Sequence, residues 1–252
     1  MTFYARVLGV AQDAGVPHIG CNCPRCERFR EAPLLPACLG LVGGEATYLC
    51  DATPAIAEQT RALPSFPTAI LLTHLHMGHM AGLLQLGKEA LNRPTTLYGS
   101  PAVCAFLRAN APWNRLPLTL VEVNERVELE PGLEVEWVRV PHRDEDADTH
   151  AFLVTGPTRS LLYLPDIDAW EIDLHALLAR CDLALLDGSF YSRDELPRQR
   201  NIPHPPITET LALLSDEEIA KVRFLHFNHT NPVLDENGPT VLAAIQGEQI
   251  AL

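Results

Sequence analysis

The order of strand-like and helix-like segments is the feature that most constrains the fold of this chain. The two kinds alternate in the first part of the sequence, from Phe3–Val10 to Pro101–Ala109. A run of consecutive strand-like segments with short Gly- or Pro-containing turns follows, from Leu118–Val123 to Ser160–Leu164, and alternation then returns. This order predicts two sheets packed face to face with helices on both outer faces, which is a four-layer αββα sandwich of the α/β class.

The boundaries of these elements follow from apolar periodicity and from Gly and Pro breaks. Strands are predicted at Phe3–Val10, Ala46–Asp51, Thr68–Leu72, Thr95–Tyr98, Leu118–Val123, Glu125–Leu129, Leu133–Val140, Ala151–Thr155, Ser160–Leu164, Leu183–Leu186 and Val222–Phe227. Helices are predicted at Pro54–Leu63, Met80–Leu91, Pro101–Ala109, Trp170–Ala179, Thr208–Ser215 and Pro239–Ile245, before a short closing strand. The sequence shows no repeat, low-complexity tract or linker, so we expect one domain over residues 1–252.

Charge and composition exclude several classes of function. The net charge is −13, and the chain has no cluster of Lys and Arg with which to bind phosphates of a nucleic acid. No apolar run reaches the roughly 18 residues of a membrane span, and the N-terminus does not resemble a signal peptide. We therefore expect a cytoplasmic protein that acts on a small molecule, with neither nucleic acid nor membrane as a partner. A homodimer is one state that the sequence allows.

Three histidines directly follow the predicted strand Thr68–Leu72, in the order His74, His76, His79. In extended chain, His74 and His76 point to the same side because they are two residues apart. Neutral imidazole binds zinc, iron and manganese, and open α/β sheets place their sites at the carboxyl ends of strands. The alternative is a chance cluster of surface histidines, but the run adjoins an apolar strand. It therefore predicts a metal site in a cleft.

This H-x-H-x-x-H run resembles the H-x-H-x-D-H signature of the metallo-β-lactamase superfamily. That resemblance implies further metal ligands after later strands, and each is present: His142 after Leu133–Val140, Asp166 after Ser160–Leu164, and His226 at the end of the last long strand. It assigns one metal to His74, His76 and His142. It assigns a second metal to His79, His226 and Asp166, with Asp166 as the bridging carboxylate. Zn²⁺, Mn²⁺ or Fe²⁺ would suit the cleft, as one ion or two.

The signature lacks its carboxylate here, because Gly78 stands where the superfamily has Asp. A second metal without that ligand is less neutralised, and ligand charge and number help to set affinity. We therefore expect a filled first site and a weak or empty second site, unless a carboxylate such as Asp187 moves in. Gly78→Asp is then expected to add one metal equivalent. Asp51 and Asp187, which each end an apolar strand, are expected to hydrogen-bond the ligand imidazoles.

Three cysteines form a C-x-C-x-x-C loop near the N-terminus: Cys21, Cys23 and Cys26. Three close thiolates make most of a tetrahedral zinc site, and free or redox-active thiols are the alternative. The resemblance supplies the fourth ligand. In the related cyclic phosphodiesterase of phosphonate breakdown, a His three residues after the last active-site His completes such a triplet, and His229 has that place here. The other cysteines are expected to be buried small hydrophobes.

The resemblance extends over nearly the whole chain and points to two branches of the superfamily. The cysteine loop, Asp187-Gly188 and the sequence NHTNPVL from Asn228 to Leu234 resemble pyrroloquinoline quinone biosynthesis protein B. The phosphodiesterase branch shares the cysteine loop, and its catalytic His aligns roughly with His204, which is otherwise an ordinary loop histidine.

The functional prediction is a metal-dependent hydrolase that uses a metal-bound hydroxide on a small substrate, for which a phosphodiester is one candidate. In this prediction Asp166 orients the nucleophile and His204 protonates the leaving group. Two alternatives remain open. One is an oxygen-using non-haem iron enzyme of quinone cofactor biosynthesis, and the other is a non-catalytic protein that binds a metal or a ligand.

Overall fold

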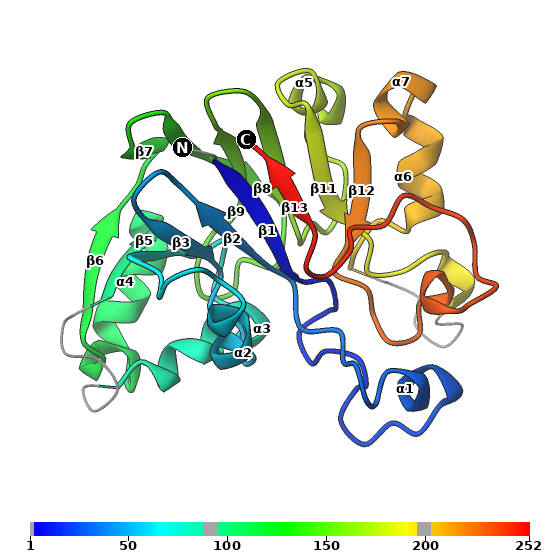
Figure 1. Ribbon diagram of the computed structural model, residues 1–252, viewed down its shortest axis with the longest axis horizontal. Helices are drawn as coiled ribbons and strands as arrows, with labels where there is room; N and C mark the ends of the chain where they lie inside the picture. Colours follow the sequence, from blue (N-terminus) through cyan, green and yellow to red (C-terminus); the bar gives the residue numbers. More distant parts are fainter. Residues whose placement is uncertain (1–2, 88–94, 196–202) are drawn as a thin grey trace.

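Two mixed β-sheets face each other in the computed structural model, which describes residues 3–87, 95–195 and 203–252 (Figure 1). In these residues the first sheet has the order β13 (Gln249–Ala251), β1 (Tyr4–Gly9), β2 (Cys38–Val42), β3 (Thr47–Cys50), β4 (Ala69–Leu71), β5 (Thr95–Gly99), β6 (Leu118–Glu122). The second has the order β12 (Val222–Leu225), β11 (Leu183–Asp187), β10 (Ser160–Leu164), β9 (Thr149–Thr155), β8 (Leu133–Val140), β7 (Arg126–Glu130).

The apolar side chains of alternate strand positions build two cores. On β2 and β3, Leu39, Leu41 and Tyr48 point into the space between the sheets, where they join residues of β8 to β12 in the larger core. Their strand neighbours, such as Cys38 and Leu49, lie on the opposite face and belong to a second core under the helices of the first sheet. Because both faces of this sheet are covered, its inner strands are apolar at nearly every position.

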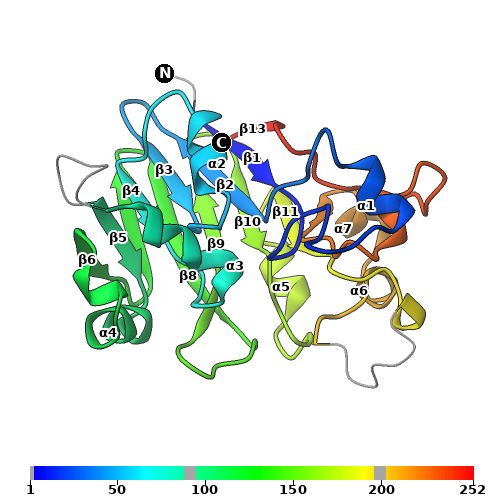
Figure 2. The ribbon, with the colours of Figure 1, turned by 90° about the horizontal axis from the view of Figure 1, so that it is seen from below.

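Helices cover the outer face of each sheet. On the first sheet these are α2 (Ile56–Arg61), α3 (Met77–Met80) and α4 (Pro101–Ala109), and on the second they are α5 (Leu174–Leu178), α6 (Ile207–Leu213) and α7 (Asp216–Ile219) (Figure 2). The short helix α1 (Pro24–Arg28) lies on a loop below the sheets (Figure 1). Single 3₁₀ turns complete the described elements: Ala81–Gln85, Trp113–Arg115, Arg193–Glu195 and Pro232–Leu234. The predicted α/β fold with two sheets is confirmed.

Two of the predicted helices are shorter in the structure than expected. Met80–Leu91 is replaced by α3 and a 3₁₀ turn over Ala81–Gln85, because Gly82 approaches the backbone of Ala52, and residues 88–91 lie outside the described residues. Of Trp170–Ala179, only α5 is helical.

The predicted helix Pro239–Ile245 is wrong. This segment runs beside β12, where Phe224 N–H donates to Leu242 O and Ala244 N–H donates to Phe224 O, so its backbone is used in a strand-like bridge. The prediction also missed β2, α1 and α7. In the described part of the chain, no helix is long and apolar enough to cross a membrane.

Candidate metal centre

The carboxyl ends of parallel strands bring the histidines of the cleft together. Strands β3, β4 and β5 run parallel in the first sheet, and β10, β11 and β12 run parallel in the second, so each set ends at one edge. The His74–His79 run follows β4, Asp166 follows β10, and His226 follows β12. His142 enters from the end of β8. The sequence positions are far apart, but the strand ends place these side chains in one buried cluster.

Three histidines form the first group of ligand atoms: His74, His76 and His142. Nε2 of His142 lies 3.0 Å from Nδ1 of His76, and the rings of His74 and His142 meet edge-on. Burial holds the pKa of His74 well below its usual value and lowers the pKa of His76 and His142. At neutral pH these rings are therefore uncharged, which is the form that binds a metal.

Asp166 lies between this group and a second one. Its Oδ1 is 3.6 Å from Nε2 of His142, whereas its Oδ2 is 2.9 Å from Nε2 of His79 and 3.3 Å from Nε2 of His226. Burial raises the pKa of Asp166, but the nearby His226 and His79 outweigh it and keep that pKa well below its usual value. An ionised carboxylate with one oxygen toward each group has the arrangement of a bridging ligand.

Asp51, at the end of β3, fixes two of these histidines. It accepts a hydrogen bond from Nδ1 of His79 at 2.9 Å, and its other oxygen accepts from the hydroxyl of Thr73 at 2.8 Å. The Thr73 oxygen in turn lies 2.9 Å from Nδ1 of His74. One buried aspartate thereby orients His79 directly and His74 through a hydroxyl, and the Nε2 of both rings faces the cleft.

Asp187, at the end of β11, repeats this arrangement on the second sheet. Its Oδ2 lies 2.7 Å from Nδ1 of His204, and its Oδ1 accepts from the Ser189 hydroxyl at 2.7 Å. Nδ1 of His226 contacts the Ser189 oxygen at 2.9 Å. Asp187 therefore reaches the ligand His226 through Ser189, and its direct partner is His204.

Backbone strain accompanies these contacts. Asp51 and His226 have φ of 70° and 65°, in the left-handed region that non-glycine residues rarely adopt. Such strain concentrates at functional sites, where the surrounding structure enforces it. Both residues end a buried strand beside the cleft, so the fold holds the strained backbone in the position that the ligand cluster requires.

The donor set fits a divalent metal. Three atoms that face the cleft are buried and lack a hydrogen-bond partner among the described residues: His74 Nε2, His226 Nε2 and Asp166 Oδ2. Buried polar atoms are normally paired, so three unpaired atoms in one cluster indicate a ligand. The other ring nitrogens of His74, His79, His142 and His226 are already engaged by Thr73, Asp51, Asp168 and Ser189. This is the pattern of histidines that bind a metal through one nitrogen.

The structure adds Asp13, a residue that the sequence analysis did not select. Its Oδ1 lies 3.6 Å from Nε2 of both His79 and His226, and these three residues form a candidate metal-binding group. Burial raises the pKa of Asp13, but the nearby imidazoles of His226 and His79 outweigh it, so the pKa falls to about 2. Asp13 comes shortly after the predicted strand Phe3–Val10, in a segment that matches no ligand position of the signature, and the one sequence signal for it was the carboxylate missing at Gly78.

The sequence names Asp187 as a carboxylate that could fill this place, but both of its oxygens are already engaged by Ser189, His204 and the backbone of Ile167. The gain of metal expected from Gly78→Asp stays a prediction, but the structure shows what the substitution would meet. A Cβ at Gly78 would lie 2.1 Å from Oδ1 and 2.6 Å from Cβ of Asp13, so Asp13 would have to move away from His79 to make room for it. Gly78 does not have the positive φ that would strain an Asp there, so the obstacle is Asp13 itself.

The cysteine loop forms a second, separate cluster. Cys21, Cys23, Cys26 and His229 place four ligand atoms within 4.8 Å of one another. Cys23 caps α1 by accepting from the Cys26 N–H, and Sγ of Cys26 lies 3.6 Å from Nδ1 of His229. Three thiols and one imidazole suit tetrahedral zinc. We call these four residues the clip.

All seven cysteines of the chain are free thiols in the structure. Outside the clip, Cys38, Cys50, Cys104 and Cys181 are buried. They pack as small apolar side chains, and burial raises the pKa of each.

Comparison with known proteins agrees with this geometry. A family model described as a beta-lactamase superfamily domain matches residues 46–227. Coenzyme PQQ synthesis protein B of Methylorubrum extorquens (strain PA1) is 29% identical over 275 residues, which cover 92% of this chain and 91% of that protein. The protein of the same name from Methylococcus capsulatus is 28% identical over 282 residues, which cover 93% and 92%.

Solved structures show the same fold. The crystal structure of Zn²⁺-bound PqqB from Methylobacterium extorquens has a TM-score of 0.83 and 27% identity, and the match covers 99% of this chain and 100% of that one. A diphosphatase from the PhnP family has a TM-score of 0.79 and 21% identity, over 100% of this chain and 98% of that one. With the matching family model, two mixed sheets and a buried His/Asp cluster at the strand ends, this chain belongs to the metallo-β-lactamase superfamily.

Proposed function

We propose that this protein is a metal-dependent hydrolase that acts on a small substrate, with a phosphodiester as the first candidate. One observation carries the proposal. Each cleft histidine except His76 has one ring nitrogen engaged by a fixed partner, which leaves its other nitrogen facing the same small volume as both oxygens of Asp166. Metallo-hydrolases need such a preorganised set, because ligands that are already oriented do not have to rearrange during the reaction.

A divalent ion bound here would lower the pKa of a water molecule and so supply a nucleophile at neutral pH. The protein's contribution is to orient it. Asp166 has oxygens toward both histidine groups and would accept a hydrogen bond from such a water molecule. Zinc is the first candidate ion for both the cleft and the clip, in keeping with the Zn²⁺-bound relative. Mn²⁺ and Fe²⁺ also suit a site of imidazoles and carboxylates.

We assign His204 the role of proton donor. It is buried, its Nδ1 donates to Asp187, and its ring centroid lies 5.5 Å from that of His142 and 5.9 Å from that of His226. Burial lowers the pKa of His204, but Asp187 outweighs it and raises the pKa to about 9. The ring is therefore protonated at neutral pH, and its Nε2 can deliver a proton to a leaving oxygen.

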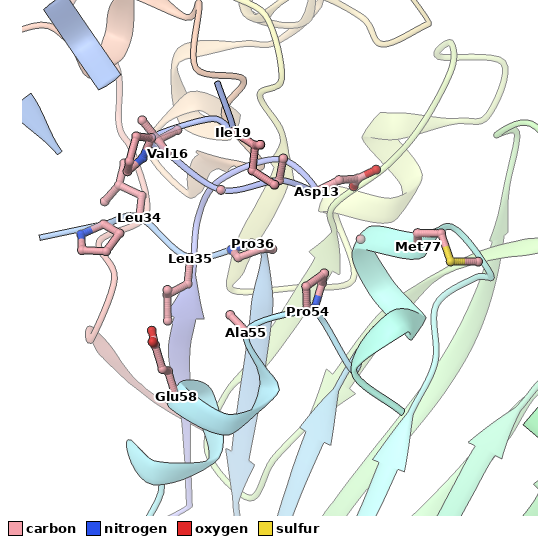
Figure 3. A pocket seen from close by; sticks show the side chains of 15 residues that line it. Asp13, Val16, Ile19, Leu34, Leu35, Pro36, Pro54, Ala55, Glu58 and Met77 are labelled. Carbon is pink, nitrogen blue, oxygen red and sulfur yellow. The ribbon is translucent and has the colours of Figure 1, made fainter. Parts of the chain in front are cut away.

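A hollow of about 560 Å³ adjoins the cleft and offers room for the organic part of a substrate. Asp13, Met77 and Gly78 line one end of it, where Figure 3 shows Asp13 and Met77, and Asp13 brings this end to within 3.6 Å of His79. The walls are mostly apolar, and the remaining labelled side chains are Val16, Ile19, Leu34, Leu35, Pro36, Pro54, Ala55 and Glu58. This lining favours an apolar group next to the bond that is cleaved.

Metal analysis combined with a substrate screen tests the proposal. Protein purified without added metal would be analysed for zinc, manganese and iron, and then assayed with bis(p-nitrophenyl) phosphate and a panel of carboxylic esters. We expect metal-dependent turnover of the phosphodiester, lost in His204→Gln while the metal content is unchanged. Iron in the cleft with oxygen consumption, or full metal with no hydrolysis of any ester, would contradict the proposal and support one of the two alternatives.

A further inference from the structure

The second ligand group lacks charge unless a further carboxylate joins it. His79 and His226 are neutral when they bind a metal, and Asp166 is shared with the first group. A divalent ion held by two imidazoles and half of one carboxylate is poorly neutralised, and hard or borderline cations gain affinity from anionic oxygen ligands. An additional ligand on the open side of His79 and His226 would complete the set.

Asp13 lies on that side. Its Oδ1 is equally distant, at 3.6 Å, from Nε2 of His79 and Nε2 of His226. Ligand atoms that surround one zinc ion at roughly 2.0–2.2 Å are separated from each other by about 3–3.5 Å. Nε2 of His79 and Nε2 of His226 lie 2.9 to 3.6 Å from Oδ1 of Asp13 and Oδ2 of Asp166. These atoms therefore have the spacing of ligands around one ion.

The Asp13 carboxylate lies where a side chain at position 78 would lie. A Cβ at residue 78 would lie 2.1 Å from Oδ1, 2.3 Å from Cγ and 2.6 Å from Cβ of Asp13. The absence of a side chain at Gly78 is therefore what allows the Asp13 carboxylate to approach His79. A side chain at position 78 would displace the Asp13 carboxylate from its present position.

The backbone fixes Asp13 to the same segment that carries His226. Phe227 N–H donates to Val10 O at 2.8 Å, and Gln12 N–H donates to Phe227 O at 2.9 Å. Gly15 N–H then donates to Gln12 O at 2.7 Å and closes a turn around Asp13. These bonds hold the two backbone segments together without a metal, and the Asp13 side chain, which is 46% exposed, extends from this fixed backbone toward His226.

We propose that Asp13 is a ligand of the second cleft metal and that it supplies, from the N-terminal loop, the carboxylate that Gly78 cannot provide. The second site is therefore complete, with His79, His226, Asp13 and the shared Asp166. Unequal occupancy caused by a missing ligand is no longer expected. The protein binds three zinc ions per chain: two in the cleft and one in the clip.

Zinc titration of chelator-stripped protein tests this inference and needs no substrate, so it is independent of the proposed hydrolysis. We expect the wild-type protein to bind three equivalents by calorimetry and by elemental analysis after gel filtration. Asp13→Asn has nearly the same shape but a weaker ligand. It should keep two equivalents and bind the third at least about tenfold more weakly, because even partners that only orient a ligand are worth roughly 10–100-fold in affinity.

Two further variants sharpen the test. Glu58→Gln removes the same charge from another exposed carboxylate of the same hollow and should keep three equivalents. The double variant Asp13→Gly with Gly78→Asp moves the carboxylate from position 13 to position 78. Glycine is used at position 13 because any Cβ there would lie 2.6 Å from the Cβ of the new Asp. The double variant should restore the third equivalent, which Asp13→Gly alone loses. Fewer than three equivalents in the wild-type protein, or three of unchanged affinity in Asp13→Asn, would overturn the inference.

Discussion

The cleft and the clip are two sites for metal ions with opposite relations to the fold. In the cleft, the strand ends and the aspartates Asp51 and Asp187 hold the histidines, most of which are fully buried. In the clip, three of the four ligands are only partly buried and belong to a loop and a short helix with little core of their own. The difference teaches that the fold positions the cleft ligands before a metal binds, whereas the clip needs its metal to hold the loop in place.

Removing the first cleft site should have the largest effect on activity and little effect on folding. We expect His74→Ala with His76→Ala to reduce phosphodiester turnover to background, because two of the three ligands of that site are lost. The clip should keep its zinc and the melting temperature should change little, since the strands pack without the metal. His175→Ala, at an exposed histidine paired with Glu218, is the control. Full cleft metal and activity in the double variant would show that the ligand assignment is wrong.

Removing a clip ligand should instead have its main effect on stability. Cys23→Ser or His229→Ala should release one zinc ion and lower the melting temperature by on the order of 5–10 °C, because structural zinc contributes folding free energy directly. Since Asp13 lies on the same N-terminal segment, the second cleft metal should also bind more weakly, while the His74–His76–His142 site keeps its affinity. Elemental analysis and thermal melts measure both effects.

The control for the clip is Cys104→Ala, which removes a buried thiol outside it and should leave the zinc content unchanged. Two observations would refute the clip: unchanged zinc content after either ligand substitution, or a disulfide between Cys21 and Cys26 in the native protein.

Substituting the residues that orient the cleft histidines should have smaller effects, and each substitution should weaken the binding of one of the two cleft metals. Ser189→Ala removes the hydroxyl between His226 and Asp187, so it should weaken the second metal by roughly 10–100-fold. Asp168→Asn alters the partner of His142, which lies 2.8 Å away, and should weaken the first metal by a similar factor. Calorimetric titration resolves the two affinities. Equal weakening of both metals by either variant would mean that the cleft binds them as one unit.

The sequence predicts the strand-end part of the cleft better than the loop part, for a physical reason. His142, Asp166 and His226 each follow an apolar strand, so a local pattern marks where they lie, and the parallel strands bring their side chains together. Asp13 also comes after an apolar strand, but it matches no ligand position of the H-x-H-x-D-H signature. Its position depends on backbone hydrogen bonds that join Val10 and Gln12 to Phe227, which lies more than two hundred residues later in the chain.

The errors in secondary structure have the same origin. The segment Pro239–Ile245 has a helical apolar pattern, but Phe224 at the edge of β12 offers its backbone N–H and C=O, and the segment pairs with it instead. The helix predicted over Met80–Leu91 gives way to a tight turn where Gly82 meets the backbone of Ala52. In both places a long-range backbone contact overrides a local preference, which sequence periodicity does not reveal.

The smallest expected effect comes from Arg25, whose contacts hold the clip loop in place without zinc. Arg25 of α1 donates to Asp235 through Nε at 2.8 Å and to the carbonyl of His229 through Nη1 at 3.0 Å, so it joins the loop to the His229 segment without a metal. Its side chain is 16% exposed and that of Asp235 is 45% exposed, so solvent screens the pair and the ion pair contributes at most about 1 kcal/mol. For a chain of this size, that corresponds to roughly 2–4 °C in melting temperature.

Arg25→Ala should therefore lower the melting temperature slightly with zinc bound, and the protein should keep the full zinc content. After chelation the same substitution should have a larger effect on the loop, measured by the rate of proteolysis within residues 10–30, because the arginine is then the main side-chain link to the His229 segment. Arg30→Ala removes a neighbouring arginine that pairs only with Glu27 of its own segment, and it should change neither measurement. If Arg25→Ala released the zinc, the clip would depend on its protein contacts as the cleft does, and the contrast between the two sites would fail.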